Sequence, residues 1–293
     1  MKTILLTAII LFTTCITYLQ AQVLDPNDPI VVYDVENPPV APPRDQIGKW
    51  VITPEVNWNS DNWKSYVYNG LAFRLRYPKN YNPNRSEEYP MIVLLHCYVF
   101  RNGTLYMNDR HLNNAGAKAF DDAVNDGDFD GFLMSPQAIN KFSGPIFQAI
   151  EEIVGIIDQE HNLDLNRVSL NGRSGGAVST WDFIADHPRL FSSALPISGV
   201  SPGTADRIPQ YKYVPIWSFQ GERDKGPYPY QTEALIDQIV AQGGNVRYTL
   251  YLGKGHGIMD IAYREDDFFP YMTRSNKTNP MVLYEQSEFC PGD

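Results

Sequence analysis

A serine flanked by glycines marks the segment of this sequence that is best suited to covalent chemistry. Residues 172–176 read GRSGG, a run with strand character at 167–171 leads into them, and residues 177–185 can form a helix. This strand–turn–helix pattern predicts a nucleophile elbow, a sharp turn that holds Ser174 above the end of a strand. The flanking glycines carry no side chains that would clash across the turn. A serine hydroxyl needs such a placement, and a base, before it can attack a substrate.

His256 is the residue that we expect to act as the base. It lies in a glycine-rich loop that reads GKGHG, directly after the last predicted strand. A histidine in a loop above a strand end can turn its ring toward Ser174 and accept the hydroxyl proton. The other histidines occupy positions that fit this role less well: His96, His111, His161 and His187.

Asp224 is the carboxylate that we expect to orient His256. It follows a predicted strand, in a turn that reads GERD. A carboxylate at this position can fix the imidazole tautomer and stabilise its cation. The chain order is then Ser174, Asp224, His256. Glu222 on the same turn and Asp260, which is nearer to the histidine in sequence, are the alternatives.

Two backbone N–H groups are expected to stabilise the negative charge that forms on the substrate oxygen. One belongs to Gly175, directly after the nucleophile, and the other to the loop after His96. Tyr98 or Cys97 supplies this second donor, and Tyr98 is preferred. The cysteines are too few for a thiolate metal site and no HExxH pattern is present, so the sequence predicts neither a metal nor an organic cofactor.

Strands that alternate with helices are expected to bring these residues together. Continuous apolar runs at 91–96 and 131–135 predict strands that are buried on both faces. Four isoleucines between positions 146 and 157 recur at helical spacing. The alternation predicts an α/β fold with a mostly parallel sheet and helices on both faces. Binding sites in such sheets lie at the carboxyl ends of the strands, where the predicted catalytic residues also fall.

Composition divides the chain into four segments. Residues 1–21 combine a charged start, an apolar run too short for a membrane span, and a cleavage pattern that ends at Ala21. This predicts a signal peptide and therefore a secreted protein, extracellular or periplasmic, with a lipid-modified Cys15 as the alternative. Residues 22–50 form a proline-rich leader, 51–274 a catalytic domain, and 275–293 an irregular tail.

Charge and cysteine content narrow the range of partners. A formal net charge of −10 argues against nucleic acid and anionic membrane surfaces. A polyanionic substrate is also disfavoured unless a local basic pocket overrides the net charge. After removal of the signal peptide, Cys97 and Cys290 remain, and an oxidising compartment could join them. A buried free thiol at Cys97 is the alternative.

From about residue 66 to residue 274 the sequence resembles the α/β-hydrolase superfamily. Within it, the chain is similar to secreted esterases of the feruloyl esterase, acetylxylan esterase and polyhydroxybutyrate depolymerase kind. The resemblance implies an α/β-hydrolase fold and a serine hydrolase of carboxylic esters that works through an acyl-enzyme. It carries over Ser174, Asp224 and His256 as the catalytic triad. The matching motifs are YPMIVLLH at 89–96, DLNRV at 164–168, ISG at 197–199, GERD at 221–224 and GH at 255–256.

Three residues near the predicted site depart from the family pattern. Cys97 stands where the family usually has glycine, and Gly175 stands where methionine is frequent. Both are expected to reshape the acyl pocket. Arg173 replaces a common leucine or aromatic residue, so it is expected either to pair with an internal acid or to reach an acidic group of the substrate. The internal pair is preferred, because charges beside such elbows are often paired within the protein.

Aromatic residues occupy the two loops that are expected to border the site: Tyr98, Phe100, Tyr228 and Tyr230. They suit a planar or sugar-linked acyl ester, and ordinary loop packing explains them equally well. Export, acidity and the family resemblance favour esters of polysaccharides or similar extracellular esters as substrates.

Two other functions compete with the esterase. A serine peptidase of the prolyl oligopeptidase type shares the order of the triad, but the sequence lacks the propeller-length N-terminal region that usually accompanies that domain. A non-catalytic binding module built on a hydrolase fold is the second alternative, because Cys97 and Arg173 depart from the family pattern.

Overall fold

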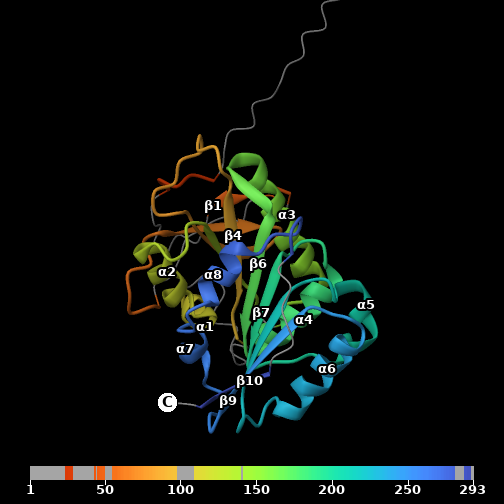
Figure 1. The fold of residues 1–293 in the computed structure, drawn as a ribbon. Helices are drawn as coiled ribbons and strands as arrows, with labels where there is room; N and C mark the ends of the chain where they lie inside the picture. The colour runs from red at the N-terminus through yellow and green to blue at the C-terminus, as the bar shows by residue number, and fades with distance from the viewer. Residues whose placement is uncertain are drawn as a thin grey trace, which may run out of the picture.

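The computed structural model describes residues 24–28, 43, 45–49, 55–97, 109–139, 141–280 and 287–291. These residues form one twisted sheet of ten strands, with helices packed on both sides (Figure 1). The strands are β1 (Gly48–Lys49), β2 (Trp63–Tyr68), β3 (Leu71–Arg76), β4 (Tyr89–Leu95), β5 (Phe132–Gln137), β6 (Leu163–Arg173), β7 (Ser193–Ile197), β8 (Ile216–Gly221), β9 (Val246–Leu252) and β10 (Ser287–Pro291).

The order of the strands across the sheet is β1-β2-β3-β5-β4-β6-β7-β8-β9-β10. The pairings from β1 to β5 are antiparallel, and those from β5 to β10 are parallel. The predicted mostly parallel sheet is therefore confirmed. All strands that precede predicted catalytic residues point the same way, so their carboxyl ends meet along one edge of the sheet, called here the carboxyl edge.

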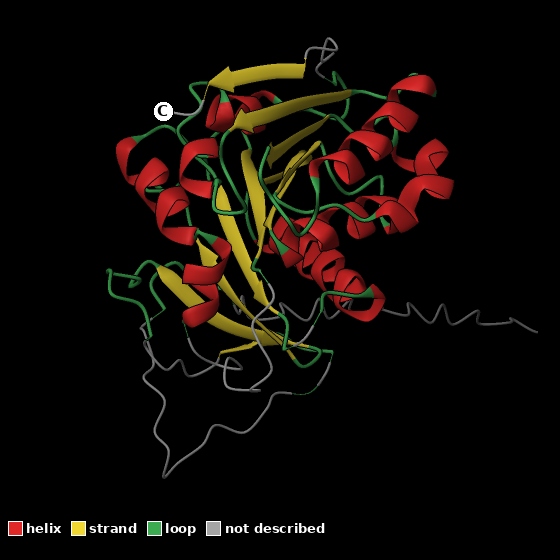
Figure 2. Cartoon of the chain, turned by 90° about the horizontal axis from the view of Figure 1, so that it is seen from below, coloured by secondary structure: helices red, strands yellow, loops and turns green. Residues whose placement is uncertain are grey.

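Helices cover both faces of the sheet, as the view from below in Figure 2 shows. One face carries α1 (Arg110–Ala115), α2 (Ala117–Asp126), α7 (Met259–Ala262) and α8 (Phe268–Arg274). The other carries α3 (Gly144–Glu160), α4 (Gly175–Asp186), α5 (Ile208–Tyr211) and α6 (Pro229–Ala241), together with a short 3-10 helix at Pro202–Arg207.

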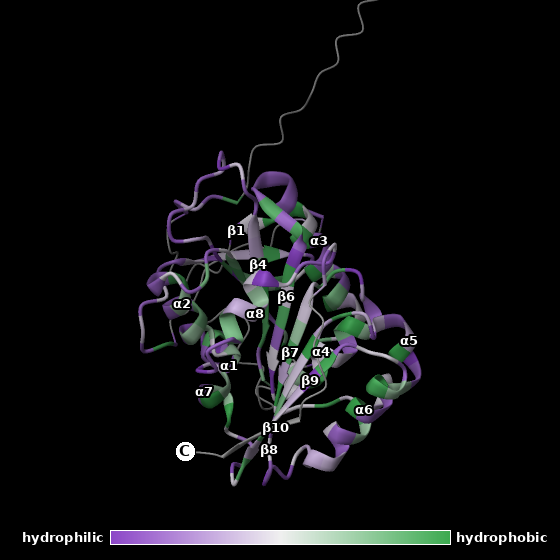
Figure 3. Ribbon diagram, in the orientation of Figure 1, coloured by the Kyte–Doolittle hydropathy of each residue, from purple (hydrophilic) through white to green (hydrophobic). Residues whose placement is uncertain are grey.

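Alternate side chains of β4 divide the interior into two cores. Met91 and Val93 pack toward the helices of the α3–α6 face. Ile92 and Leu94 pack toward the opposite helix layer. A strand that is buried on both faces in this way reads as a continuous apolar run, which is the pattern that predicted it. In Figure 3 the apolar colours accordingly gather on the strands and on the helix faces turned toward them.

Parts of the predicted leader pack against the domain. Leu24 is fully buried in the core, and its backbone N–H donates to Glu160 Oε2 at 3.0 Å. Tyr66 donates its hydroxyl to Asp28 at 2.7 Å. Strand β1 adds an antiparallel edge beside β2. The predicted signal peptide, residues 1–21, lies outside the described residues.

The predicted irregular tail contains a strand. Residues 287–291 form β10, which pairs in parallel with β9. An outer strand leaves a row of backbone donors and acceptors open, and a passing segment can satisfy them whatever its local sequence pattern. Because the pairing is non-local, no local pattern in residues 275–293 predicts this strand.

The order of the strands also sets the separation between Cys97 and Cys290. Cys97 follows β4 and Cys290 lies in β10, which is five strand positions away. At about 4.8 Å per position, the two chains are roughly 24 Å apart. A disulfide requires Cα atoms within about 7 Å. Cys97 is therefore a free thiol, and the pairing with Cys290 is excluded.

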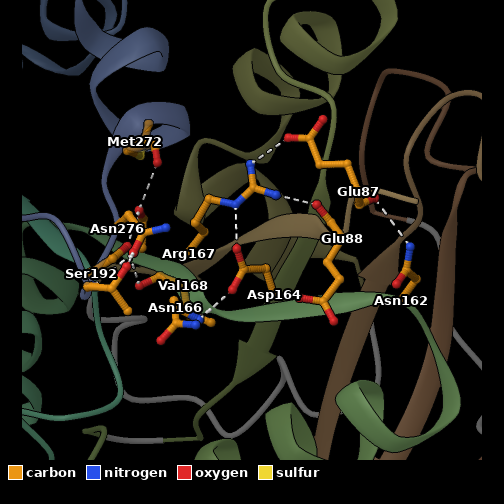
Figure 4. A network of polar contacts seen from close by, with 12 residues as sticks. Glu87, Glu88, Asn162, Asp164, Asn166, Arg167, Val168, Ser192, Met272 and Asn276 are labelled. Carbon is orange, nitrogen blue, oxygen red and sulfur yellow. Dashed lines mark hydrogen bonds and ion pairs between the residues drawn. The ribbon is translucent and has the colours of Figure 1, made fainter. Parts of the chain in front are cut away.

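A polar network holds the opposite edge of the sheet, where the parallel strands begin (Figure 4). Arg167 lies at its centre, on the first half of β6. Its Nε donates to Asp164 at 2.7 Å and its Nη1 to Glu87 at 3.3 Å, while Nη2 donates to the Glu88 carbonyl. The network thus joins the start of β6 to the segment that enters β4. We call this side the amino edge.

Candidate active site

Ser174 occupies a strained turn between β6 and α4. Its φ of 53° and ψ of −116° place a non-glycine residue in a sparsely populated region. Its N–H donates to the carbonyl of Ile197 at 2.8 Å, which ties the turn to the end of β7. A Cβ atom on Gly172 would lie 2.3 Å from the Gly176 carbonyl oxygen. One on Gly176 would lie 2.1 Å from the Leu95 carbonyl oxygen, so only glycine fits at either end of the motif.

His256 lies between Ser174 and Asp224. Its Nε2 is 2.9 Å from Ser174 Oγ, and its Nδ1 is 2.8 Å from Asp224 Oδ2. Because an ionised carboxylate only accepts hydrogen bonds, the Nδ1 proton is directed at Asp224 and Nε2 can accept from the serine hydroxyl. The His256 carbonyl accepts a hydrogen bond from Ser198 Oγ at 2.9 Å, which holds the loop above β7. The structure thus brings together the three residues predicted as a triad.

Asp224 is buried and held by further donors. Gln220 Nε2 donates to Asp224 Oδ2 at 3.0 Å, and the Gly226 N–H donates to Oδ1 at 2.9 Å. Thr232 in turn donates its hydroxyl to Gln220 Oε1 at 3.2 Å. The sequence interpretation missed Gln220 and Thr232. Gln220 ends an apolar strand and is fully buried, and no local sequence pattern marks it.

The two alternative acids face elsewhere. Glu222 is exposed, and its Oε2 accepts a hydrogen bond from the Gly253 N–H at 2.7 Å. Asp260 is exposed in the first turn of α7. Only Asp224 contacts His256 among these candidates.

The remaining histidines have other partners. His161 lies at the amino edge between the hydroxyls of Tyr77 and Tyr81, at 3.2 and 2.8 Å. His187 lies 2.7 Å from Glu151 at the same edge. Neither of these two rings therefore competes with His256 for the place beside Ser174.

His96 is a buried neutral residue that holds the start of the loop after β4. Its Nδ1 lies 2.7 Å from the Cys97 carbonyl oxygen, and its Nε2 accepts from the Ala138 N–H at 3.0 Å. Burial lowers the pKa of His96 to about 4. The ring is therefore neutral at pH 7, with its proton on Nδ1, and it joins the carboxyl ends of β4 and β5.

The Cys97 N–H is not available as an oxyanion donor. It donates to the Asn114 carbonyl oxygen at 3.0 Å. This removes one of the two predicted choices for the second donor. The other, Tyr98, lies outside the described residues, as does Phe100. Gly175, the first predicted donor, begins α4, where N–H groups have no partner within the helix.

Among the described residues, Arg173 contacts a backbone carbonyl rather than an acid. Its Nη1 donates to the Asn113 carbonyl oxygen at 3.2 Å, and no carboxylate of a described residue contacts it. Asn113 lies in the last turn of α1, and its carbonyl also accepts from the Gly116 N–H at 3.1 Å. The neighbouring carbonyls of Asn113 and Asn114 thus accept from Arg173 and from Cys97, respectively.

The charge of Arg173 also acts on the neighbouring thiol. Burial raises the pKa of Cys97, and the nearby Arg173 charge lowers it in part. Cys97 is half-buried. Cys97 and Arg173, two of the three residues that depart from the family pattern, therefore both contact the last turn of α1.

Tyr228 lies on the segment that follows Asp224. It is 47% exposed and stacks on Tyr230, which is 64% exposed, with ring centroids 5.6 Å apart. The Pro227 carbonyl before it accepts from Gln220 at 3.2 Å. The exposed pair is thereby attached to the same glutamine that holds Asp224.

Comparison with solved structures defines the fold class. The chain is similar to a thermostable esterase, with 24% identity, a TM-score of 0.63, and coverage of 73% of this chain and 63% of the other. It is similar to a feruloyl esterase module from Clostridium thermocellum complexed with sinapinate, with 16% identity, a TM-score of 0.51, and coverage of 89% and 98%. These likenesses show the α/β-hydrolase fold, and the chain resembles esterases of this fold, feruloyl esterases among them.

A putative dipeptidyl aminopeptidase IV from Bacteroides ovatus is also similar, with 13% identity, a TM-score of 0.53, and coverage of 71% and 34%. The chain spans less than two thirds of this protein and of the thermostable esterase. No family model and no curated protein matches the chain. Among the described residues, no helix has the length and apolar character needed to cross a bilayer, and no cluster of three potential metal ligands occurs.

Proposed function

We propose that this protein is a serine hydrolase of carboxylic esters. The observation that carries the proposal is the continuous contact from Ser174 Oγ through both nitrogens of His256 to Asp224, at 2.9 and 2.8 Å. These distances suit proton transfer from the serine to the imidazole. A hydroxyl in contact with an oriented base is the arrangement that makes serine a nucleophile.

The proposed reaction runs through an acyl-enzyme. Ser174 Oγ attacks the ester carbonyl carbon while its proton moves to His256 Nε2, and Asp224 stabilises the imidazolium. The tetrahedral intermediate then collapses, the C–O bond to the alcohol breaks, and His256 returns the proton to the departing alkoxide. A water molecule next gives a proton to His256 and attacks the acyl carbon. Collapse of the second intermediate releases the acid and restores the serine hydroxyl.

We assign the oxyanion donors to the backbone of Gly175 and Tyr98. The support is indirect and comes from Cys97, whose two backbone polar groups are both occupied, the N–H by the Asn114 carbonyl and the carbonyl by His96. The assignment of Tyr98 thus rests on the exclusion of Cys97 and on the position of the loop that follows β4.

We propose export after cleavage near Ala21 and an extracellular ester substrate, linked to a polysaccharide or a similar polymer. The exposed stacked pair of Tyr228 and Tyr230 supports an aromatic or sugar group beside the reacting ester. Arg173 has a charge that no described carboxylate neutralises, so we assign it to an acidic group of the substrate. Cys97 borders the same region.

A peptidase of the prolyl oligopeptidase type is the second candidate, and the likeness to the putative dipeptidyl aminopeptidase supports it. The test is turnover of p-nitrophenyl acetate, methyl ferulate and a prolyl anilide by wild type and Ser174→Ala in parallel. Serine-dependent turnover of the esters alone supports the esterase. Turnover of the anilide in place of the esters supports the peptidase. Absence of any serine-dependent turnover favours the non-catalytic binding module.

A further inference from the structure

A pocket lies at the amino edge, at the opposite end of the parallel strands from Ser174. Its volume is about 880 Å³, which is within the range of small-molecule sites. Ser192 lines it just before β7 begins, whereas Ser198, which holds the His256 loop, follows the other end of that strand. Six residues of extended chain separate these positions, or roughly 20 Å. The pocket therefore does not belong to the proposed catalytic site.

Internal hydrogen bonds hold the polar wall of this pocket in place. His187 Nδ1 lies 2.7 Å from Glu151 Oε2. Lys277 Nζ donates to the carbonyls of Arg189 and Leu190 at 3.0 and 3.4 Å. Both groups keep hydrogen-bonding capacity, because an ammonium has three donors and a carboxylate has two oxygens. A ligand would thus meet groups that are already fixed.

An exposed aromatic ring stands beside the polar wall. Tyr213 lines the pocket and is 70% exposed, the largest exposed fraction among the large apolar side chains of the described residues. Phe191, which is buried, lines it as well. An aromatic face next to fixed donors and acceptors suits a pyranose ring, which has apolar C–H faces and a hydroxyl rim.

The charges of the pocket favour a neutral ligand. Two acids line it, Glu151 and Asp186, and two bases, Arg189 and Lys277. Asp186 is also paired with Arg207 outside the lining set. The charged groups balance one another within a chain of formal charge −10. Hydroxyl groups can accept from the bases and donate to the acids, whereas an anion or a cation would meet repulsion from one of the two sets.

We infer that this pocket is a second binding site for a neutral saccharide chain, with Tyr213 as its stacking residue. Its occupation does not require the chemistry of Ser174. A polymer held there would keep the protein close to its substrate and raise the effective concentration of esters on the same chain. The inference therefore goes beyond the proposed hydrolase activity and can be tested apart from it.

The test is native electrophoresis of the Ser174→Ala protein in gels that contain arabinoxylan, hydroxyethylcellulose or polygalacturonate, beside a gel without polymer. We expect retardation in at least one of the two neutral polymers. Adding Tyr213→Ala should weaken the apparent affinity about 3- to 10-fold, the range expected for one aromatic contact. Leu165→Ala is the matched control, since Leu165 is also an exposed apolar residue at the amino edge but does not line the pocket.

Three results would overturn the inference. They are absence of retardation in both neutral polymers, equal retardation with and without Tyr213→Ala, and retardation by polygalacturonate alone, which would indicate an anion site. Thermal melting of each variant shows whether it is folded, so loss of binding cannot be confused with unfolding. Because Ser174 is already replaced, these results do not depend on whether the protein is an esterase.

Discussion

The two edges of the sheet differ in backbone strain and in how their charges are paired, although β6 contributes to both. At the carboxyl edge, β6 ends in the strained turn at Ser174, and the Arg173 charge beside it has no described carboxylate partner. At the amino edge, the same strand begins in the network around Arg167, where every guanidinium nitrogen donates to an oxygen. Of the two arginines of β6, Arg173 beside the strained turn has no described carboxylate partner, whereas Arg167 at the amino edge is paired.

Backbone conformation shows the same contrast. Ser174 and Ser198, both at the carboxyl edge, have φ values of 53° and 54°. Such conformations cost of order 1–3 kcal/mol each and persist only where neighbouring structure enforces them. The buried strands and the paired amino edge supply that enforcement. A rigid amino edge thus holds the reactive carboxyl edge in place. Substitutions at the amino edge should therefore change stability, and substitutions at the carboxyl edge should change catalysis.

Ser174→Ala should have the largest effect on activity. Removal of the nucleophile is expected to lower kcat for p-nitrophenyl acetate about 10⁴–10⁶-fold, because His256 and Asp224 then have no serine to activate. Steady-state kinetics on the purified protein measures it. Ser192→Ala is the control at the amino edge, where loss of a serine hydroxyl should change kcat less than about twofold. A Ser174→Ala protein that keeps most of its activity would refute the mechanism.

Acid should destabilise the folded state through two buried histidines, His96 at the carboxyl edge and His161 at the amino edge. Burial lowers the pKa of His96 and of His161 to about 4, against about 6.5 in the unfolded chain. The unfolded state therefore binds more protons between these values, and stability falls as the pH drops from about 6.5 to about 4. Each histidine contributes up to about 3 kcal/mol to this loss.

Substitutions of His161 and of His96 should differ in their effects on kcat. His161→Phe at the amino edge is expected to flatten the acid dependence of the free energy of unfolding, measured by urea titration, and to leave kcat unchanged. His96→Phe should flatten it as well but lower kcat, because His96 holds the Cys97 carbonyl. Equal kcat in both variants would contradict the division between the edges.

Gln220→Leu should lower kcat by about 10- to 100-fold, with a smaller change in KM. The loss reflects a hydrogen bond to the charged Asp224, worth about 1.5–3 kcal/mol. Gln238→Leu is the control, since this exposed amide donates only to a carbonyl within its own helix. A KM increase at constant kcat would instead assign Gln220 to substrate binding.

Motifs predicted the residues that react, whereas contacts between distant segments escaped prediction. Ser174 and His256 lie in short glycine-rich patterns that are visible locally. The support by Gln220 depends on Thr232 in α6, and a single glutamine in an apolar strand carries no pattern. The partner of Arg173 is a backbone carbonyl sixty positions away, which no residue type reveals. The alternation of strands and helices likewise predicted the sheet, but not β10.

Arg167→Ala should have the smallest effect and act on stability alone. The guanidinium is 15% exposed and Asp164 is 14% exposed, so removal leaves a largely buried carboxylate without its partner. We expect the free energy of unfolding to fall by about 1–3 kcal/mol in urea titration. At conditions where the variant is folded, kcat and KM should match the wild type, because the substitution lies at the start of β6 and Ser174 follows its end. Arg85→Ala, which loses more exposed ion pairs with Glu87 and Asp130, is the control and should cost less. A fall in kcat for Arg167→Ala without a loss of stability would show that the amino edge shapes the reactive turn directly, rather than only keeping the strand in place.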